Sequence, residues 1–122
     1  PRLMLALNVV AAPTDEEAEF LASSQKQAFA AIRTGRPGPL PPPIHNVEAQ
    51  LDPAALGMMR SMLSCMVVGS PETVRAGISD FIDRYTPDEL IITAQVFDHA
   101  ARKRSFDIVA DVMGLAPIAA VA

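Results

Sequence analysis

The stretch VVGSPETVRAGISDFIDRYTPDELIITAQVFDHAARKRSF, Val67–Phe106, decides the fold. Apolar runs at 65–68 and 89–96 each lead into a segment whose apolar residues recur at helical spacing. Ser70 and Asp98 stand where those helices would begin, and both residue types are good N-caps. The stretch therefore predicts strand, helix, strand, helix. Helix-length connections between buried strands indicate parallel β/α units.

The first third of the chain predicts another such unit. Residues 3–11 are almost continuously apolar, which is typical of a strand buried on both faces in a parallel sheet. Thr14 and Glu17 have the spacing of a capping box, in which the hydroxyl accepts from the Glu17 amide and the carboxylate reaches back to the Thr14 amide. A helix is expected from there to Arg33, with Gly35 just beyond its end.

A proline-rich loop should follow this helix. Five prolines lie within residues 35–46, and proline excludes both a helix interior and a central strand. Long loops of this kind are lids, binding loops or linkers, so a lid-like loop over 35–51 and an interdomain linker are both open. Arg33 and Arg36 at the root of the loop could meet an anion. A short helix is expected after Pro53.

The helical spacing also predicts which side chains face the core. They are, in chain order, Leu21, Gln25, Ala28, Phe29 and Ile32, then Leu56, Met59 and Leu63, then Val74, Ile78, Phe81, Ile82 and Tyr85, and last Phe106, Val109 and Met113.

Composition limits the classes of function. The chain has 122 residues, of which 50% are hydrophobic and 20% charged, so we expect a single globular domain. Its net charge of −4 argues against a nucleic-acid partner. No apolar run approaches the roughly 18 residues of a membrane span, and no signal peptide is recognisable, so the cytoplasm is the expected compartment. Cys65 lies in an apolar run, where a buried, inert thiol is expected.

Ligands of parallel α/β folds bind at the carboxyl ends of the strands, and three segments have that position: 8–14, 69–70 and 95–99. Gly69 and Ser70 precede a helix and could offer backbone amides to a phosphate. The alternative is structural, because Gly69 would then permit the turn and Ser70 would only cap the helix.

Asp98 and His99 could act together in acid or base chemistry, as in a hydrolase. The structural alternative makes Asp98 an N-cap and His99 a surface residue of the first turn. Arg102, Lys103 and Arg104 are expected on a solvated face. The sequence has no metal-ligand spacing, P-loop or nucleophile elbow.

Four stretches together resemble the C-terminal part of the bacterial luciferase-like flavin-dependent monooxygenases. They are NVVAAPTDEEAEFL, RTGRPGPLPPP, VVGSPETVRAGISDF and ELIITAQVFDHAARKRSF, and the resemblance extends from Leu3 to about Met113. It implies that the chain is a partial luciferase-like domain, with about three of the eight units of a TIM-type (β/α)8 barrel.

The same resemblance implies FMN as cofactor and a small organic substrate, oxidised with reduced flavin and O₂. It places Gly69 and Ser70 at a cofactor-binding turn, and it assigns the active-site wall or lid to Arg33, Arg36, Gln95, Asp98 and His99. The family's main flavin contacts lie in earlier strands, so this chain alone is expected to be inactive.

A second hypothesis is a noncatalytic, stand-alone α/β module. Three parallel strands leave open edges and apolar faces, and self-association would cover them. A homo-oligomer is therefore expected under either hypothesis.

Overall fold

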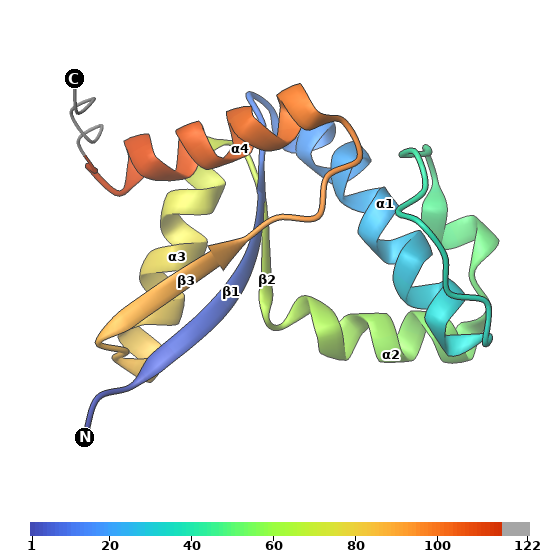
Figure 1. The fold of residues 1–122 in the computed structure, drawn as a ribbon, viewed down its shortest axis with the longest axis horizontal. Coiled ribbons are helices and arrows are strands. Elements are labelled where there is room, and N and C mark those ends of the chain that lie inside the picture. The colour runs from blue at the N-terminus through green and yellow to red at the C-terminus, as the bar shows by residue number, and fades with distance from the viewer. Residues whose placement is uncertain (116–122) are drawn as a thin grey trace.

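The computed structural model describes residues 1–115, apart from the side chains of residues 62 and 63 (Figure 1). The predicted tail after Pro117 lies outside the described residues. The elements are β1 (Met4–Ala11), α1 (Asp15–Arg33), the 3₁₀ helix η1 (Val47–Gln50), α2 (Pro53–Leu63), β2 (Met66–Gly69), α3 (Pro71–Tyr85), β3 (Glu89–Thr93) and α4 (His99–Val112). The predicted alternation of strands and helices is confirmed.

All three strands are parallel, and β1 lies in the centre of the order β2-β1-β3. The first half of β1 pairs with β3 from Met4 opposite Glu89, and its second half pairs with β2 up to Ala11 opposite Gly69. Only Asn8 pairs on both sides among the strand residues. β1 is the longest of the three strands, and one shorter strand pairs with each of its edges.

This order differs from a simple run of consecutive barrel units, in which β2 would be central. The structure confirms a parallel α/β fold, whereas closure into a (β/α)8 barrel stays a prediction.

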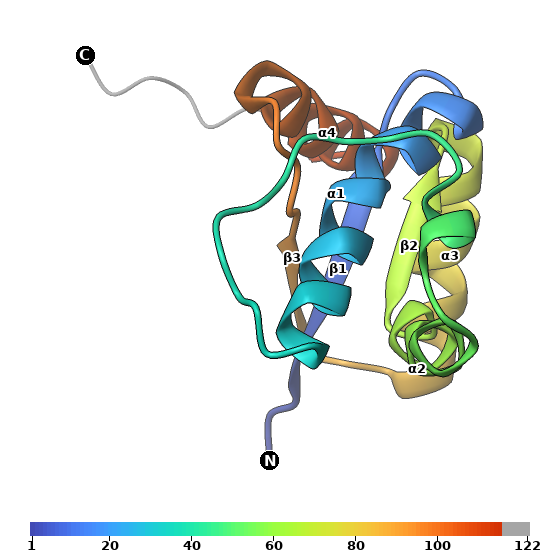
Figure 2. The ribbon, with the colours of Figure 1, turned by 90° about the vertical axis from the view of Figure 1, so that its right-hand side faces the viewer.

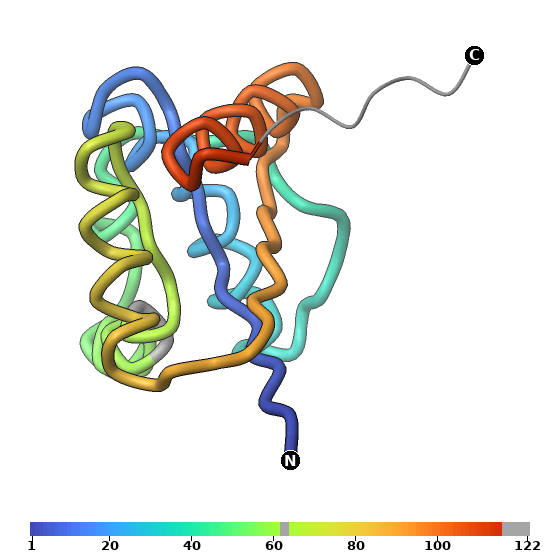
Figure 3. The backbone as a smooth tube through the Cα atoms, turned by 90° about the vertical axis from the view of Figure 1, so that its left-hand side faces the viewer, coloured from blue at the N-terminus to red at the C-terminus, as the bar shows by residue number. Residues whose placement is uncertain are grey.

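The sheet separates two apolar clusters because successive residues of β1 point to opposite faces. On one face Leu7, Val9 and Ala11 pack with Val74 and Ile78 of α3 and with Val109 of α4. On the other, Val10 packs with α1 through Ala18, Leu21 and Ala22. Figures 2 and 3 show α1 on the opposite side of the strands from α3 and α4.

The α1 side of the sheet is covered only at the carboxyl ends of the strands. Met4 is therefore 53% exposed and Ile91 47% exposed, so the prediction that β1 and β3 are buried along their whole length was wrong. Ile91 lies opposite Ala6 on this face, and Ala6 is exposed too. β3 also ends earlier than predicted, at Thr93.

Several predicted core positions are confirmed and others are not. Leu21, Gln25, Met59, Val74, Ile78 and Val109 are buried. Ile32, Tyr85 and Met113 are exposed because they lie at or just beyond the ends of their helices. Phe106 is exposed in the middle of α4 because it lies beside the buried face that Ala101, Ser105 and Val109 form. Cys65 is exposed as well, since β2 begins one residue later than predicted, so the expected burial of its thiol was wrong.

Thr14 and Asp98 cap their helices through their side chains as predicted, whereas Ser70 stands at the N-cap of α3 without a side-chain cap hydrogen bond. Thr14 Oγ1 accepts from the Glu17 amide at 3.2 Å, and Asp98 Oδ2 accepts from the Ala101 amide at 2.8 Å. The other half of the predicted capping box was wrong, because the Glu17 carboxylate accepts from Arg104 at 2.7 Å instead. That ion pair joins the start of α1 to α4.

Candidate functional site

A hollow of about 380 Å³ lies at the carboxyl end of β3. It is lined by Leu40 of the proline-rich segment, by Ala94, Gln95, Val96 and Phe97 after β3, and by His99 and Arg102 of α4. The predicted wall residues Gln95 and His99 are thus brought together with a residue of the predicted lid. Apolar side chains form most of this wall, and the polar groups come from Gln95, His99 and Arg102.

Asp98 and His99 do not form an acid–base pair in this structure. The Asp98 carboxylate caps α4, while His99 Nδ1 lies 2.8 Å from Arg102 Nη2. A guanidinium can only donate, so Nδ1 is the acceptor and the neutral imidazole carries its proton on Nε2. The geometry therefore matches the structural alternative for both residues, because Asp98 caps α4 and His99 is exposed in its first turn.

The turn at Gly69 and Ser70 is filled by a carboxylate of the chain itself. Asp15 Oδ1 accepts from the Ser70 amide at 2.7 Å and from Thr73 Oγ1 at 2.8 Å. These hydrogen bonds, first that of the Ser70 amide, hold the pKa of Asp15 below its ordinary value. A Cβ atom at residue 69 would lie 2.5 Å from Thr73 Cβ, so glycine is what lets these groups approach.

An FMN phosphate does not fit this turn as it is folded. The Ser70 amide is already engaged, and the negative charge of Asp15 would repel a phosphate. Binding at Gly69 and Ser70 therefore stays a prediction that requires Asp15 to move away.

Arg33 and Arg36 lie apart from the hollow. Arg33 sits at the last residue of α1 and contacts α2, where Nη1 donates to the Ala54 carbonyl at 3.2 Å and also contacts the Met58 sulfur. The Arg36 side chain is exposed. The structure thus brings only part of the predicted wall and lid together.

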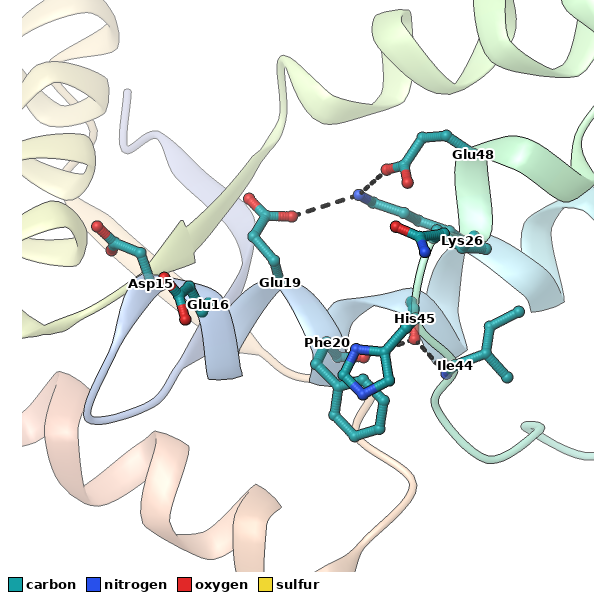
Figure 4. Close-up of a pocket in the computed structure, with 11 residues that line it drawn as sticks. Asp15, Glu16, Glu19, Phe20, Lys26, Ile44, His45 and Glu48 are labelled. Atoms are coloured by element: carbon teal, nitrogen blue, oxygen red, sulfur yellow. Dashed lines mark hydrogen bonds and ion pairs between the residues drawn. The ribbon is translucent and has the colours of Figure 1, made fainter.

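A second cavity, of about 440 Å³, lies between α1 and the segment that enters η1 (Figure 4). Lys26 lies in its wall with a side chain only 5% exposed, and its ammonium contacts Glu19 at 3.4 Å and Glu48 at 3.1 Å. The Phe20 and His45 rings stack with centroids 4.3 Å apart. The pKa of Glu48 is lowered by its own backbone amide and by Lys26.

Sequence reasoning missed both Asp15 and this second cavity. Asp15 and Ser70 are 55 residues apart, and Lys26 and Glu48 are 22 apart, so no local pattern marks either contact. Within residues 1–115, no group of three potential metal ligands gathers, and no helix is both long and apolar enough to cross a bilayer.

No protein-family model matches the chain. Among curated proteins, it is 38% identical over 112 residues to a luciferase-like monooxygenase of Escherichia coli strain K12. It has the same identity to the uncharacterized protein YvbT of Bacillus subtilis strain 168. Each match covers 92% of this chain and 33% of the relative, so the chain spans about a third of the length of these relatives.

A solved structure agrees with this comparison. The crystal structure of apo-MsnO8 is 26% identical and superposes with a TM-score of 0.76, covering 97% of this chain and 36% of the longer one. The resemblance to part of a luciferase-like monooxygenase is therefore confirmed for nearly all of the chain.

Proposed function

We propose that this chain is one part of an FMN-dependent monooxygenase, which oxidises a small organic substrate with reduced flavin and O₂. The observation that supports this most directly is the 38% identity to the Escherichia coli luciferase-like monooxygenase over 92% of the chain. Because the chain spans a third of that relative, we propose that it supplies part of the active-site wall and lid and is inactive alone.

The hollow after β3 is the part of the site that we assign to this chain. Leu40, Val96 and Phe97 present apolar surface that excludes water from a ligand, and exclusion of water strengthens polar contacts within a site. Gln95 and His99 would orient the ligand, His99 through its Nε2–H group. The oxygen chemistry itself belongs to the flavin.

The main flavin contacts must come from other polypeptide. The Gly69–Ser70 turn is occupied by Asp15, so it offers no free phosphate site. The chain's own share is therefore binding and enclosure of the ligand rather than a reacting group.

A noncatalytic module that self-associates is the second candidate. It is favoured by the apolar patch on the α1 side of the sheet, where Met4 and Ile91 are exposed. The same patch would be covered by further strands in a longer enzyme, so its exposure alone does not separate the two functions.

A chimaeric protein separates them. Residues 1–115 would replace the matched third of the Escherichia coli relative, and O₂ consumption with reduced FMN would be measured across a panel of small organic substrates. The native relative provides the reference rate. We expect the chimaera to retain substrate-stimulated O₂ consumption and to lose it when Phe97→Asp places a charge in the hollow. A folded chimaera without any activity, beside an active native relative, would support the noncatalytic module.

A further inference from the structure

The second half of the proline-rich segment is fastened to α1 along its length. Four contacts do this: Gln27 Nε2 donates to the Pro42 carbonyl at 2.9 Å, the Ile44 amide donates to Ser23 Oγ at 2.8 Å, His45 stacks on Phe20, and Lys26 Nζ donates to Glu48. Each contact joins residues at least 15 positions apart. The segment 42–48 is therefore held by side chains that α1 presents in successive turns.

The first half of the same segment is held differently. Residues 35–39 are exposed, and Leu40 is the residue that lines the hollow after β3. Figure 2 shows the segment running along α1 and then across to η1. Residues 35–39 are thus exposed and the segment meets the hollow through Leu40, whereas residues 42–48 are anchored to α1 by side chains.

Lys26 is the buried charge of the anchor. A buried ammonium is costly unless it is paired, and Lys26 is 5% exposed. Of its two partners, Glu19 belongs to α1 itself, so that contact does not bind the segment. Glu48 belongs to η1, and its contact with Lys26 therefore crosses from the segment to α1.

We propose that residues 42–48 act as a latch pinned by Lys26, which confines movement of the lid-like segment to residues 35–41 and sets the position of Leu40 over the hollow. The lid role rests on the proposed function. The latch itself rests only on the contacts above, so it can fail or hold independently of flavin activity.

Amide hydrogen exchange in the 122-residue chain tests the latch directly. The Ile44 amide should exchange at least about tenfold more slowly than the amides of Gly38 and Leu40, because a local opening must break its bond to Ser23. Equal exchange rates, after correction for intrinsic rates, would overturn the latch.

Two matched variants then test the pin. Glu48→Gln removes the negative charge that the segment contributes to its contact with Lys26. Glu19→Gln removes the negative charge that α1 itself contributes to Lys26. We expect Glu48→Gln to speed Ile44 exchange about fivefold to tenfold and Glu19→Gln to change it less than about twofold. The Ile78 amide in α3 serves as the reference for global unfolding. Equal effects of the two variants, or a matching rise at Ile78, would overturn Lys26 as the pin.

Discussion

Asp15 and Ser70 join the first two strand–helix turns of the fold, since Asp15 Oδ1 accepts the Ser70 amide hydrogen bond at 2.7 Å. Thr73 Oγ1 donates to the same oxygen at 2.8 Å. The carboxylate thus stands at the positive N-terminus of α3, where an anion is favourable. A place expected from the sequence to attract a phosphate is filled from within the chain.

Replacing Asp15 should make the fold less stable and less sensitive to acid. The pKa of Asp15 is lower in the folded chain than its ordinary value of about 4. The stability that the ionised carboxylate adds to the fold is therefore complete above that ordinary value and is lost as the pH falls through the folded pKa. Asp15→Asn should lower the urea midpoint at pH 7 and flatten its decline below about pH 4. Asp107→Asn, on the exposed surface of α4, is the control. An unchanged pH profile in Asp15→Asn would contradict the contact.

Gly69→Ala should destabilise the chain by about 1–3 kcal/mol, because the added methyl group cannot be accommodated without shifts. The Cβ atom would lie 2.5 Å from Thr73 Cβ and 2.7 Å from Asp15 Oδ1. The measurement is the free energy of unfolding in urea.

Gly57→Ala provides a control of opposite sign. Gly57 lies within α2, and a methyl group added there would meet no neighbouring atom within 4 Å. Alanine should therefore stabilise the helix by about 0.5–1 kcal/mol. If both variants were equally stable, the close packing at Gly69 would be refuted.

Ser105→Ala should cost about 1–3 kcal/mol, since it leaves a buried amide without its acceptor. Ser105 Oγ accepts from the Ala11 amide at 2.9 Å, at the part of β1 that extends beyond the end of β3. Ser79→Ala, on the exposed face of α3, should change stability by less than about 0.5 kcal/mol. Equal unfolding free energies for the two variants would show that Ser105 does not support the strand.

Self-association is expected from the uncovered sheet face. Sedimentation velocity at micromolar concentrations should show a dimer or larger species, and Ile91→Lys should shift the chain toward monomer because it places a charge within the exposed patch. A compact monomer that unfolds cooperatively would mean that the chain tolerates this face in water.

Local signals predicted the elements well. The apolar runs, the caps at Thr14 and Asp98 and the glycine after α1 each act within a few residues, so the sequence carries them directly. Positions near helix ends were less predictable. Ile32 has helical spacing but is 65% exposed, because periodicity gives a face and not the neighbour that covers it.

Long-range relationships were not predictable from one sequence. The strand order β2-β1-β3, the Asp15 contact with Ser70 and the Ser105 contact with Ala11 all join residues that are distant in the chain. For the site, position at a strand end grouped Gln95 with His99, and both line the hollow after β3. The sequence did not show that Arg33 lies away from these two residues, at the C-terminal end of α1.

Fluorescence titration of FMN separates a partial monooxygenase from a chain that binds flavin by itself, because we propose that this chain supplies a wall and a lid but not the main flavin contacts. FMN would be titrated with the 122-residue chain and with the chimaera that contains residues 1–115. We expect saturable, stoichiometric binding by the chimaera. The isolated chain should not saturate below roughly 10 μM FMN, which corresponds to a binding free energy weaker than about −7 kcal/mol. Sub-micromolar, stoichiometric binding by the isolated chain would show that the main flavin contacts lie within it, and no binding by a folded chimaera would show that the chain is not part of a flavin site.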